Sequence, residues 1–342
     1  MRARNFLFCF VLITLLSACS GSGETSPTST PLPTDTAVPL PTLTATPVVP
    51  LAILVLPATL DEESSNLYQK TVYDLTQTSG MRFQVRNSLT VADLEPGLQI
   101  VIALAPDPGI ASLAAAAPAV QFLAINISGI ASGGNVSVLA NDAQSDIAAF
   151  LAGYTAALIT DDYRIGMIMP KDNPQAAHAA VAFRNGMTFY CGTCKPVYFP
   201  AFCIAENLQA CFPQYVEIPA DEDKSKYGPY ADYLMAQRRV QTLYLYPDIA
   251  TDDLETYIGT TGAWLIGTQT PAELPAGWVM TIQPDVVKAI QNAWPKLVSG
   301  QGGITVQSPL GLSDVDSTLL SPGKQRLVKQ KLDDLQAGLI GP

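Results

Sequence analysis

The sequence predicts an α/β protein with two lobes, each built as a doubly wound parallel sheet. Short apolar runs rich in β-branched residues alternate with amphipathic stretches along most of the chain. This alternation is typical of parallel sheets that are covered by helices on both faces. Residues 51–342 are too many for most single-core domains and suit two lobes.

The first half of the chain supplies four of the expected strands. They are expected at 51–56 (LAILVL), 100–106 (IVIALAP), 120–128 (VQFLAINIS) and 165–169 (IGMIM). A helix that ends at Gly80 follows the first strand, and an alanine-rich helix follows the second. The stretch DIAAFLAGYTAALITDDYR before the fourth strand predicts an amphipathic helix, with Asn141 or Asp142 as its N-cap and TDDYR as the turn after it.

The second half continues the same alternation. Helices are expected around NPQAAHAAVAFRNGM, PYADYLMAQRR and PDVVKAIQNAWPKLVSG, and strands near QYVEI and at 242–246, 263–267 and 278–282. Ligands of open parallel sheets bind at the carboxyl ends of the strands, so functional residues are expected directly after these runs. The segment DEDKSKYG, 221–228, lacks the spacing of a calcium loop and reads as a solvated loop.

The N-terminus predicts a location outside the cytoplasm. Arg2 and Arg4 precede the apolar run FLFCFVLITLL, which is the layout of a secretory signal over residues 1–18. The residues LSAC resemble a bacterial lipobox, which implies cleavage before Cys19 and lipidation of its thiol. The alternative is a membrane-spanning anchor, but the apolar run is shorter than the ~20 residues that a span needs. Residues 19–50 then form a lipidated cysteine and a Pro- and Thr-rich linker, which is expected to be disordered.

The charge of the chain restricts its partners. The sequence has 19 basic and 30 acidic residues, a net charge of −11. Nucleic acids and anionic lipids require clustered Lys and Arg, so neither is expected as the principal partner.

The central part of the sequence resembles the basic-membrane-protein family of substrate-binding lipoproteins. The residues that carry the resemblance are PAVQFLAINIS, GNVSVLAND and above all AFLAGYTAALIT, preceded by Asp146 at the place of the family's acidic residue. AWLIGTQ and SPGKQRLVKQKLDDLQAGLI are similar to later parts of the family, so the resemblance spans most of 51–340.

The resemblance implies a type I periplasmic-binding-protein fold, in which three chain segments join two lobes that close on a ligand. It places the crossings near Asn141–Asp142, near Gln283 and around Gly302–Gly303. Lobe 1 would then hold residues 51–141 and 284–303, and lobe 2 residues 142–283 and 304–342. It implies a monomer that delivers a small polar solute, a nucleoside in several members, to an ABC permease. The alternative is an extracytoplasmic sensor or interaction module of the same fold.

The expected ligand-binding residues depart from those of nucleoside binders in the family. Asn126 and Gln269 stand where the family has carboxylates, and Tyr68 stands at the place of a stacking phenylalanine. Amides both donate and accept hydrogen bonds, whereas carboxylates only accept, so a changed ligand is expected. The remaining candidates are Asn141, Asp142 and Asp248.

Four cysteines lie in an insertion at 190–212, at positions Cys191, Cys194, Cys203 and Cys211. A C-x2-C-x8-C-x7-C set could bind zinc, but an even, clustered set outside the cytoplasm predicts two disulfides. A bond between Cys191 and Cys194 would close a small ring, so each is expected to pair with Cys203 or Cys211.

Enzymatic chemistry has little support in the sequence. His178, the only histidine, lies in the alanine-rich stretch NPQAAHAAVAF, which predicts an exposed helix residue rather than a general base. The sequence holds no G-x-S-x-G or H-E-x-x-H motif and no phosphate-binding glycine loop. We therefore expect a binding protein without catalytic residues, metal or cofactor.

Overall fold

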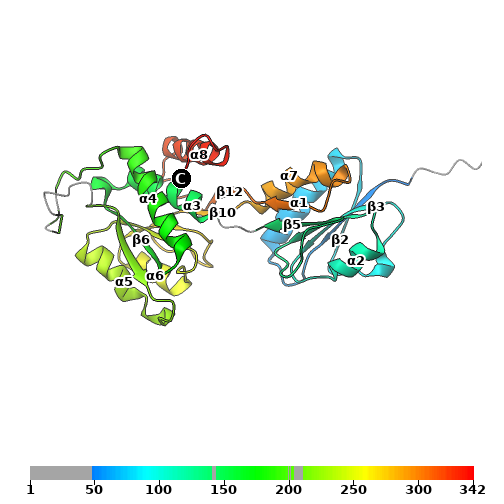
Figure 1. Ribbon diagram of the computed structural model, residues 1–342, viewed down its shortest axis with the longest axis horizontal. Helices are drawn as coiled ribbons and strands as arrows, with labels where there is room; N and C mark the ends of the chain where they lie inside the picture. Colours follow the sequence, from blue (N-terminus) through cyan, green and yellow to red (C-terminus); the bar gives the residue numbers. More distant parts are fainter. Residues whose placement is uncertain (1–47, 141–143, 199, 201, 204–210) are drawn as a thin grey trace, which may run out of the picture. The chain divides into compact units, whose positions relative to one another are not determined.

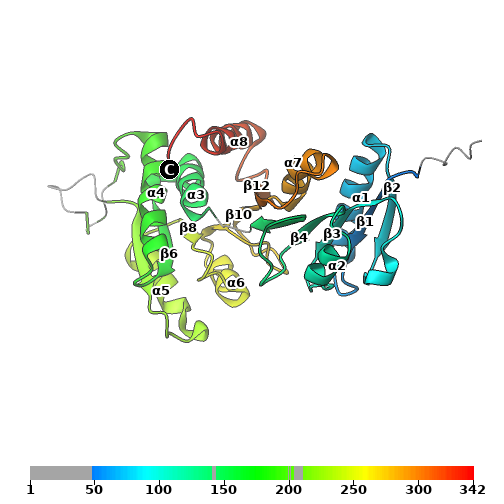
Figure 2. The same cartoon turned by 45° about the vertical axis from the view of Figure 1, so that its right-hand side comes forward.

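The computed structural model describes residues 48–140, 144–198, 200, 202–203 and 211–342, which form two α/β lobes (Figures 1 and 2). Each lobe contains a six-stranded sheet, so the predicted fold class is confirmed. The predicted signal peptide, Cys19 and the linker up to residue 47 lie outside the described residues.

The first lobe is built on a sheet whose strands all run parallel, in the order β11-β5-β4-β3-β1-β2. Its strands are β1 (Leu51–Val55), β2 (Arg82–Arg86), β3 (Leu98–Leu104), β4 (Gln121–Ile125), β5 (Val136–Ala140) and β11 (Thr305–Gln307). Its helices are α1 (Glu62–Thr78), α2 (Ile110–Ala116), α7 (Val286–Val298) and the short η1 (Val91–Asp93). Helices α1 and α7 lie together on one face of the sheet and α2 lies on the other (Figure 1).

Strand β1 shows how an apolar run produces this layering. Successive side chains of a strand point to opposite faces, so Ala52 and Leu54 pack in the cluster under α1 and α7, while Leu51, Ile53 and Val55 pack in the cluster under α2. Because both faces are covered, a continuous apolar strand is stable here without alternating polar residues.

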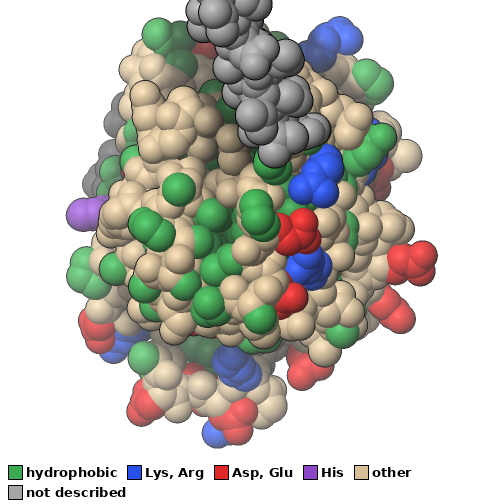
Figure 3. All heavy atoms as spheres, turned by 90° about the vertical axis from the view of Figure 1, so that its right-hand side faces the viewer, with side chains coloured by type: hydrophobic (Ala, Val, Ile, Leu, Met, Phe, Trp, Pro, Cys, Tyr) green, Lys and Arg blue, Asp and Glu red, His purple; other side chains and the backbone are tan. Residues whose placement is uncertain are grey.

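Strand β2 is an edge of this sheet and is protected by charge. The Arg86 guanidinium lies 2.8 Å from a Glu95 carboxylate oxygen and 3.3 Å from one of Asp93. Figure 3 shows basic and acidic side chains alternating beside apolar ones on this end of the molecule. Charged side chains on an edge strand discourage pairing with a second chain.

The second lobe is built on a sheet in the order β12-β10-β9-β8-β6-β7, in which only β12 runs antiparallel to its neighbour. Its strands are β6 (Ile165–Pro170), β7 (Gln214–Ile218), β8 (Thr242–Leu245), β9 (Trp264–Gly267), β10 (Trp278–Pro284) and β12 (Leu310–Ser313). Its helices are α3 (Ser145–Ile159), α4 (Pro174–Cys191), α5 (Gly228–Asp232), α6 (Asp252–Thr260) and α8 (Pro322–Gln336), with short turns η2 (Asp161–Tyr163), η4 (Lys224–Lys226) and η5 (Tyr233–Gln237).

Helices α3 and α4 pack against each other through two glycines. A Cβ at Gly153 would overlap the carbonyl oxygen of Phe183, and a Cβ at Gly186 would overlap that of Phe150. Only glycine therefore permits this approach, and Gly153 is the glycine of the FLAGYTAAL stretch. The N-cap of α3 is Gln144, so the prediction that Asn141 or Asp142 caps the helix is wrong. The predicted turn at TDDYR and the buried strand after it are confirmed.

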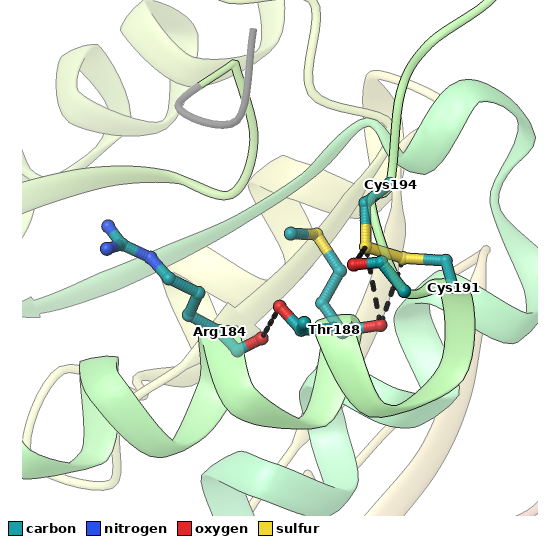
Figure 4. The surroundings of a disulfide bond; sticks show 6 residues. Arg184, Thr188, Cys191 and Cys194 are labelled. Atoms are coloured by element: carbon teal, nitrogen blue, oxygen red, sulfur yellow. Dashed lines mark hydrogen bonds between the residues drawn. A yellow bond between two sulfur atoms is a disulfide. The ribbon is translucent and has the colours of Figure 1, made fainter. Parts of the chain in front are cut away.

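The four cysteines form two disulfides, Cys191–Cys194 and Cys203–Cys211, so the predicted cross-pairing is wrong. Figure 4 shows the first of them, at the end of α4. Helix α4 ends at Cys191, and the positive φ values of Gly192 and Cys194 turn the chain back. The two Cα atoms of this pair are consequently 5.0 Å apart, which is within the usual range for a disulfide. With all four sulfurs paired, no thiolate remains here for zinc.

Two of the crossings between the sheets lie in the described residues. Strand β10 belongs to the second sheet and α7 packs on the first, so the chain crosses at Pro284–Asp285, next to the predicted Gln283. Strand β11 still pairs with β5 in the first sheet, so the last crossing is at Ser308–Pro309 and not at Gly302–Gly303. A Cβ at Gly303 would meet the backbone of Gly134, which shows that this glycine packs inside the first lobe.

Candidate ligand-binding site

The carboxyl edge of the first sheet carries Asn126. This residue directly follows β4 and adopts a φ of 56°, a left-handed conformation that asparagine tolerates better than most residues. Its side chain is exposed. Asn141 and Asp142 follow β5 at the same edge but lie outside the described residues.

Tyr68 lies on α1 and is half-buried against the apolar cluster of the first lobe. Burial raises the pKa of its phenol, and the charges of Asp61 and Asp285 raise it further. Tyr68 lines a hollow of about 490 Å³ beside the segment in which β10 passes into α7. Asp285 caps α7 by accepting from the Lys288 backbone N–H at 2.8 Å. Asn126 does not line this hollow, so these two candidates are not brought together in it.

The carboxyl edge of the second sheet carries a cavity of about 440 Å³ that includes Asp248. Residues that follow β6, β7 and β8 form it, because parallel strands end at the same edge. Buried Ile218, Tyr227 and Ile249 contribute apolar surface. The charged residues of its lining are Lys171, Asp172, Lys224 and Asp248.

The charged side chains of this cavity have no partners within the described part of the chain. None of the four forms an ion pair within 4.0 Å or a side-chain hydrogen bond there. Lys226, only two residues from Lys224, does have a partner, because its ammonium lies 3.8 Å from Glu222.

Of the residues that line this cavity, only Asp248 is among the ligand-binding candidates predicted from the sequence; the other three charged residues and Tyr227 are not. Lys171 and Asp172 stand directly after the predicted strand IGMIM, so the rule that places ligands at strand ends would have identified them. Lys224 and Tyr227 belong to the segment DEDKSKYG. Part of that predicted solvated loop therefore lines the cavity.

Gln269 follows β9 and is exposed, but it does not line the cavity of Asp248. The loop that carries it is fixed through its neighbour Thr270, whose hydroxyl donates to Oδ2 of Asp314 at 2.7 Å. The same oxygen accepts from Thr281 at 2.7 Å and from Ser313 at 3.0 Å. Asp314 thus joins the β9 loop to β10 and to the end of β12.

This network changes the acidity of Asp314. Burial by itself would raise the pKa of the carboxyl, but the hydrogen bonds from Thr270, Thr281 and Ser313 outweigh it and hold the pKa below its usual value. Trp278 extends the network, since its indole N–H donates to the Thr281 hydroxyl at 3.2 Å.

The single histidine and possible metal ligands are further candidates for parts of a site. His178 is exposed on α4, as predicted. Among the described residues, no group of three or more His, Cys, Asp or Glu side chains is arranged to hold a metal ion. Within the same residues, no helix combines the length and the apolar character that crossing a membrane requires.

Comparisons with known proteins give no family assignment. No family model matches the chain, and no curated protein matches it. The resemblance to the basic-membrane-protein family therefore stays a prediction that rests on the residues quoted above.

Several solved structures are similar to this chain. A transcriptional activator of the comK gene from Bacillus halodurans is 10% identical, with a TM-score of 0.49, and the alignment covers 83% of this chain and 96% of that one. A periplasmic ribose ABC transporter protein from Conexibacter woesei DSM 14684 is 12% identical, with a TM-score of 0.46 and coverage of 82% and 95%. A solute-binding protein of an ABC transporter system from Aeropyrum pernix K1 is 14% identical, with a TM-score of 0.43 and coverage of 86% and 93%.

These similarities are too distant to assign a ligand or a partner to this chain. The fold itself follows from the two sheets, which are mostly parallel, and from the crossings between them. This is the two-lobed, doubly wound α/β fold class that the sequence predicts.

Proposed function

We propose that this chain is an extracytoplasmic substrate-binding protein that captures a small polar solute as its two lobes close. The observation that carries the proposal is the pair of doubly wound sheets, each with polar residues at its carboxyl edge: Asn126 in the first, and the cavity of Asp248 in the second. Ligands of open parallel sheets bind at this edge.

Closure would occur at the crossings between the lobes. The Gln144 side-chain amide donates to the Ser308 carbonyl at 2.7 Å, and the Asp285 backbone N–H donates to the Pro309 carbonyl at 2.7 Å. The crossing at Ser308–Pro309 is thus hydrogen-bonded to Gln144, at the start of α3, and to Asp285, at the crossing between β10 and α7. A solute that contacts both lobes stabilises the closed state by the difference between its affinities for the closed and open states.

The N-terminus supports a tether to the cell membrane. We propose that residues 1–18 are removed, that Cys19 is lipidated, and that the linker up to residue 50 holds the lobes away from the bilayer. The two disulfides support an oxidising compartment, since such bonds are rare in the cytosol.

The proposed role is delivery of the solute to an ABC permease. The family resemblance implies a nucleoside, on which Tyr68 would stack and to which Asn126 and Gln269 would hydrogen-bond. Because amides replace the family's carboxylates at the last two positions, other small polar solutes belong in the same test.

The test is a thermal-shift screen of the full-length chain in mild detergent against nucleosides, purine bases, sugars and amino acids. A ligand at 100 times its dissociation constant stabilises the folded state by about 2.7 kcal/mol, so a true ligand raises the melting temperature clearly. Absence of a shift with every solute class would count against a binding function. For transport, uptake of the identified solute is expected to fall in cells that lack this protein.

A further inference from the structure

The cavity at the carboxyl edge of the second sheet suggests which class of solute the protein takes. Its volume of about 440 Å³ lies within the range of small-molecule sites in proteins, about 300–1,000 Å³. It combines an apolar surface of Ile218, Ile249 and the Tyr227 ring with charged residues of both signs.

The charges of the cavity are balanced, whereas the chain as a whole is acidic. Two lysines and two aspartates line it, in a protein with 19 basic and 30 acidic residues. Although Lys171 and Asp172 are neighbours in sequence, no lysine of the cavity lies within 4.0 Å of an aspartate oxygen in the described residues. All four residues are exposed and therefore solvated, and a ligand that carries both signs could replace their water.

Tyr227 adds a hydroxyl that a polar ligand could use. The residue is only 6% exposed and lines the cavity, and no hydrogen bond from its hydroxyl occurs among the described residues. The hydroxyl oxygen is not among the buried polar atoms that lack a partner, so water can reach it. A polar ligand in the cavity would replace that water.

The N-terminus of α4 adds to the positive side of the cavity. This helix has 18 residues and begins with Pro174, which has no N–H, while the Asn173 side chain accepts from the Ala176 N–H at 3.0 Å. The backbone N–H of Gln175, a residue that also lines the cavity, is left without a partner in the described residues. The helix dipole favours a negative group at this end.

We propose that this cavity binds a zwitterionic solute of the amino-acid type. Its carboxylate would contact Lys171, Lys224 and the Gln175 N–H, its ammonium group would contact Asp172 and Asp248, and its side chain would lie on the apolar surface. A neutral nucleoside could hydrogen-bond to these side chains but carries no charges that match the two lysines and two aspartates. The inference rests on the proposed binding function and names a solute class that differs from the one the resemblance implies.

The test is isothermal titration calorimetry on the full-length chain in mild detergent, with the twenty L-amino acids and sets of nucleosides, sugars and purine bases as probes. For the amino acid that binds most tightly, the methyl ester removes the carboxylate charge and the N-acetyl derivative removes the ammonium charge. Each derivative is expected to bind between about 10- and 100-fold more weakly, because each loses charge-assisted hydrogen bonds.

Variants of the chain then locate the site. Lys224→Met and Asp248→Asn are each expected to weaken binding by about 10- to 100-fold. Lys226→Met removes a nearby lysine that does not line the cavity and is expected to leave the affinity unchanged. Tyr227→Phe removes only the unpaired hydroxyl and is expected to weaken binding without lowering the melting temperature.

The possible outcomes separate this inference from the proposed function. Binding of a nucleoside, a sugar or a purine base but of no amino acid overturns the inference and leaves the binding function in place. Derivatives that bind as well as the parent amino acid, or an amino acid whose affinity is unaffected by Lys224→Met and Asp248→Asn, also overturn it. Failure of every solute class to bind overturns both.

Discussion

The first lobe divides its core into two clusters on the faces of an all-parallel sheet, whereas the second lobe holds one continuous cluster and ends its sheet in an antiparallel strand. The second lobe also contains the glycine contact of α3 with α4, both disulfides and the hydrogen bonds that converge on Asp314. The same lobe carries the four unpaired charges of the cavity. The close helix contact, the disulfides and the polar cavity therefore all lie in the second lobe. Substitutions in that lobe are the most direct test of this difference between the two lobes.

The largest effect is expected from Gly186→Val. Its added side-chain atoms would collide with the Phe150 backbone, which cannot move without separating α3 from α4. We expect a loss of more than about 3 kcal/mol in the unfolding free energy. Hydrogen exchange measured by mass spectrometry should show faster exchange in peptides of the second lobe and little change in the first. Gly323→Ala on α8, where a Cβ would make only an ordinary contact of 3.9 Å with the Arg326 side chain, is the control and should be neutral. Equal loss of protection in both lobes would contradict the independence of the two cores.

The second-largest effect is expected from the double substitution Cys203→Ser and Cys211→Ser, which removes the disulfide that closes the longer loop. Opening this loop, whose ends are 8 residues apart, should cost about 2 to 3 kcal/mol through the entropy of the unfolded chain. The matched variant Cys191→Ser with Cys194→Ser opens a separation of 3 residues and should cost less. Urea unfolding of the two variants tests this order, and equal midpoints for both variants and the parent would count against it.

Glu255 should give the second lobe a pH dependence of about 2 kcal/mol. Burial raises the pKa of this carboxyl to about 7, and the Asp252 charge adds to the rise. Between about pH 4.5 and pH 7 the folded state keeps a proton that the unfolded state releases, so the unfolding free energy falls as pH rises through this window and then levels. Glu255→Gln should remove this fall. Urea unfolding at pH 5 and pH 8 measures the change in unfolding free energy between the two pH values. If this change is the same in Glu255→Gln as in the unsubstituted protein, Glu255 is not its cause.

Asp314 should make the unfolding free energy rise with pH, the opposite of Glu255, and by a smaller amount, about 1 kcal/mol. Since its pKa is lowered in the folded state, its contribution is present above the unfolded pKa of about 3.8 and is lost as pH falls through the folded value. Asp314→Ala should therefore cost stability at pH 7 and little at pH 2. It should also shift the fluorescence of Trp278, which is linked to Asp314 through Thr281. An unaltered spectrum would argue against this coupling.

The sequence predicts the layers of this fold better than the edges of its sheets. Strands β1, β3, β4 and β6 are continuous apolar runs and were predicted from that property alone. Strands β2, β5, β11 and β12 were missed, and all of them except β5 are edges of their sheets. An edge strand is covered less completely, so its sequence can be short or charged, like RFQVR in β2, and carries a weak apolar signal.

For the candidate site, the sequence indicated the edge of each sheet at which it should lie better than it indicated the residues that line it. Asn126, Asp248 and Gln269 follow β4, β8 and β9, as expected from the apolar runs, and their role in binding stays a prediction. The cavity could not be predicted from Asp248, since it also needs Lys224 and Tyr227 from a loop that follows another strand. The cysteine pairing was missed for a similar reason: the turn after α4, which brings Cys194 back to Cys191, depends on two positive φ values that spacing does not reveal.

The bond between Cys203 and Cys211 has a consequence for proteolysis in the extracytoplasmic setting proposed above. A protease that cut the chain anywhere between these cysteines would leave the two fragments covalently joined through their sulfurs. Phe202, next to Cys203, packs on the guanidinium of Arg238 at 5.1 Å, and Arg238 also lies 4.9 Å from the ring centre of Tyr233. The new chain end at Cys203 would therefore stay fixed to the second lobe. A nicked molecule should migrate as one band on a gel without reductant, separate into two bands with it, and still bind its solute.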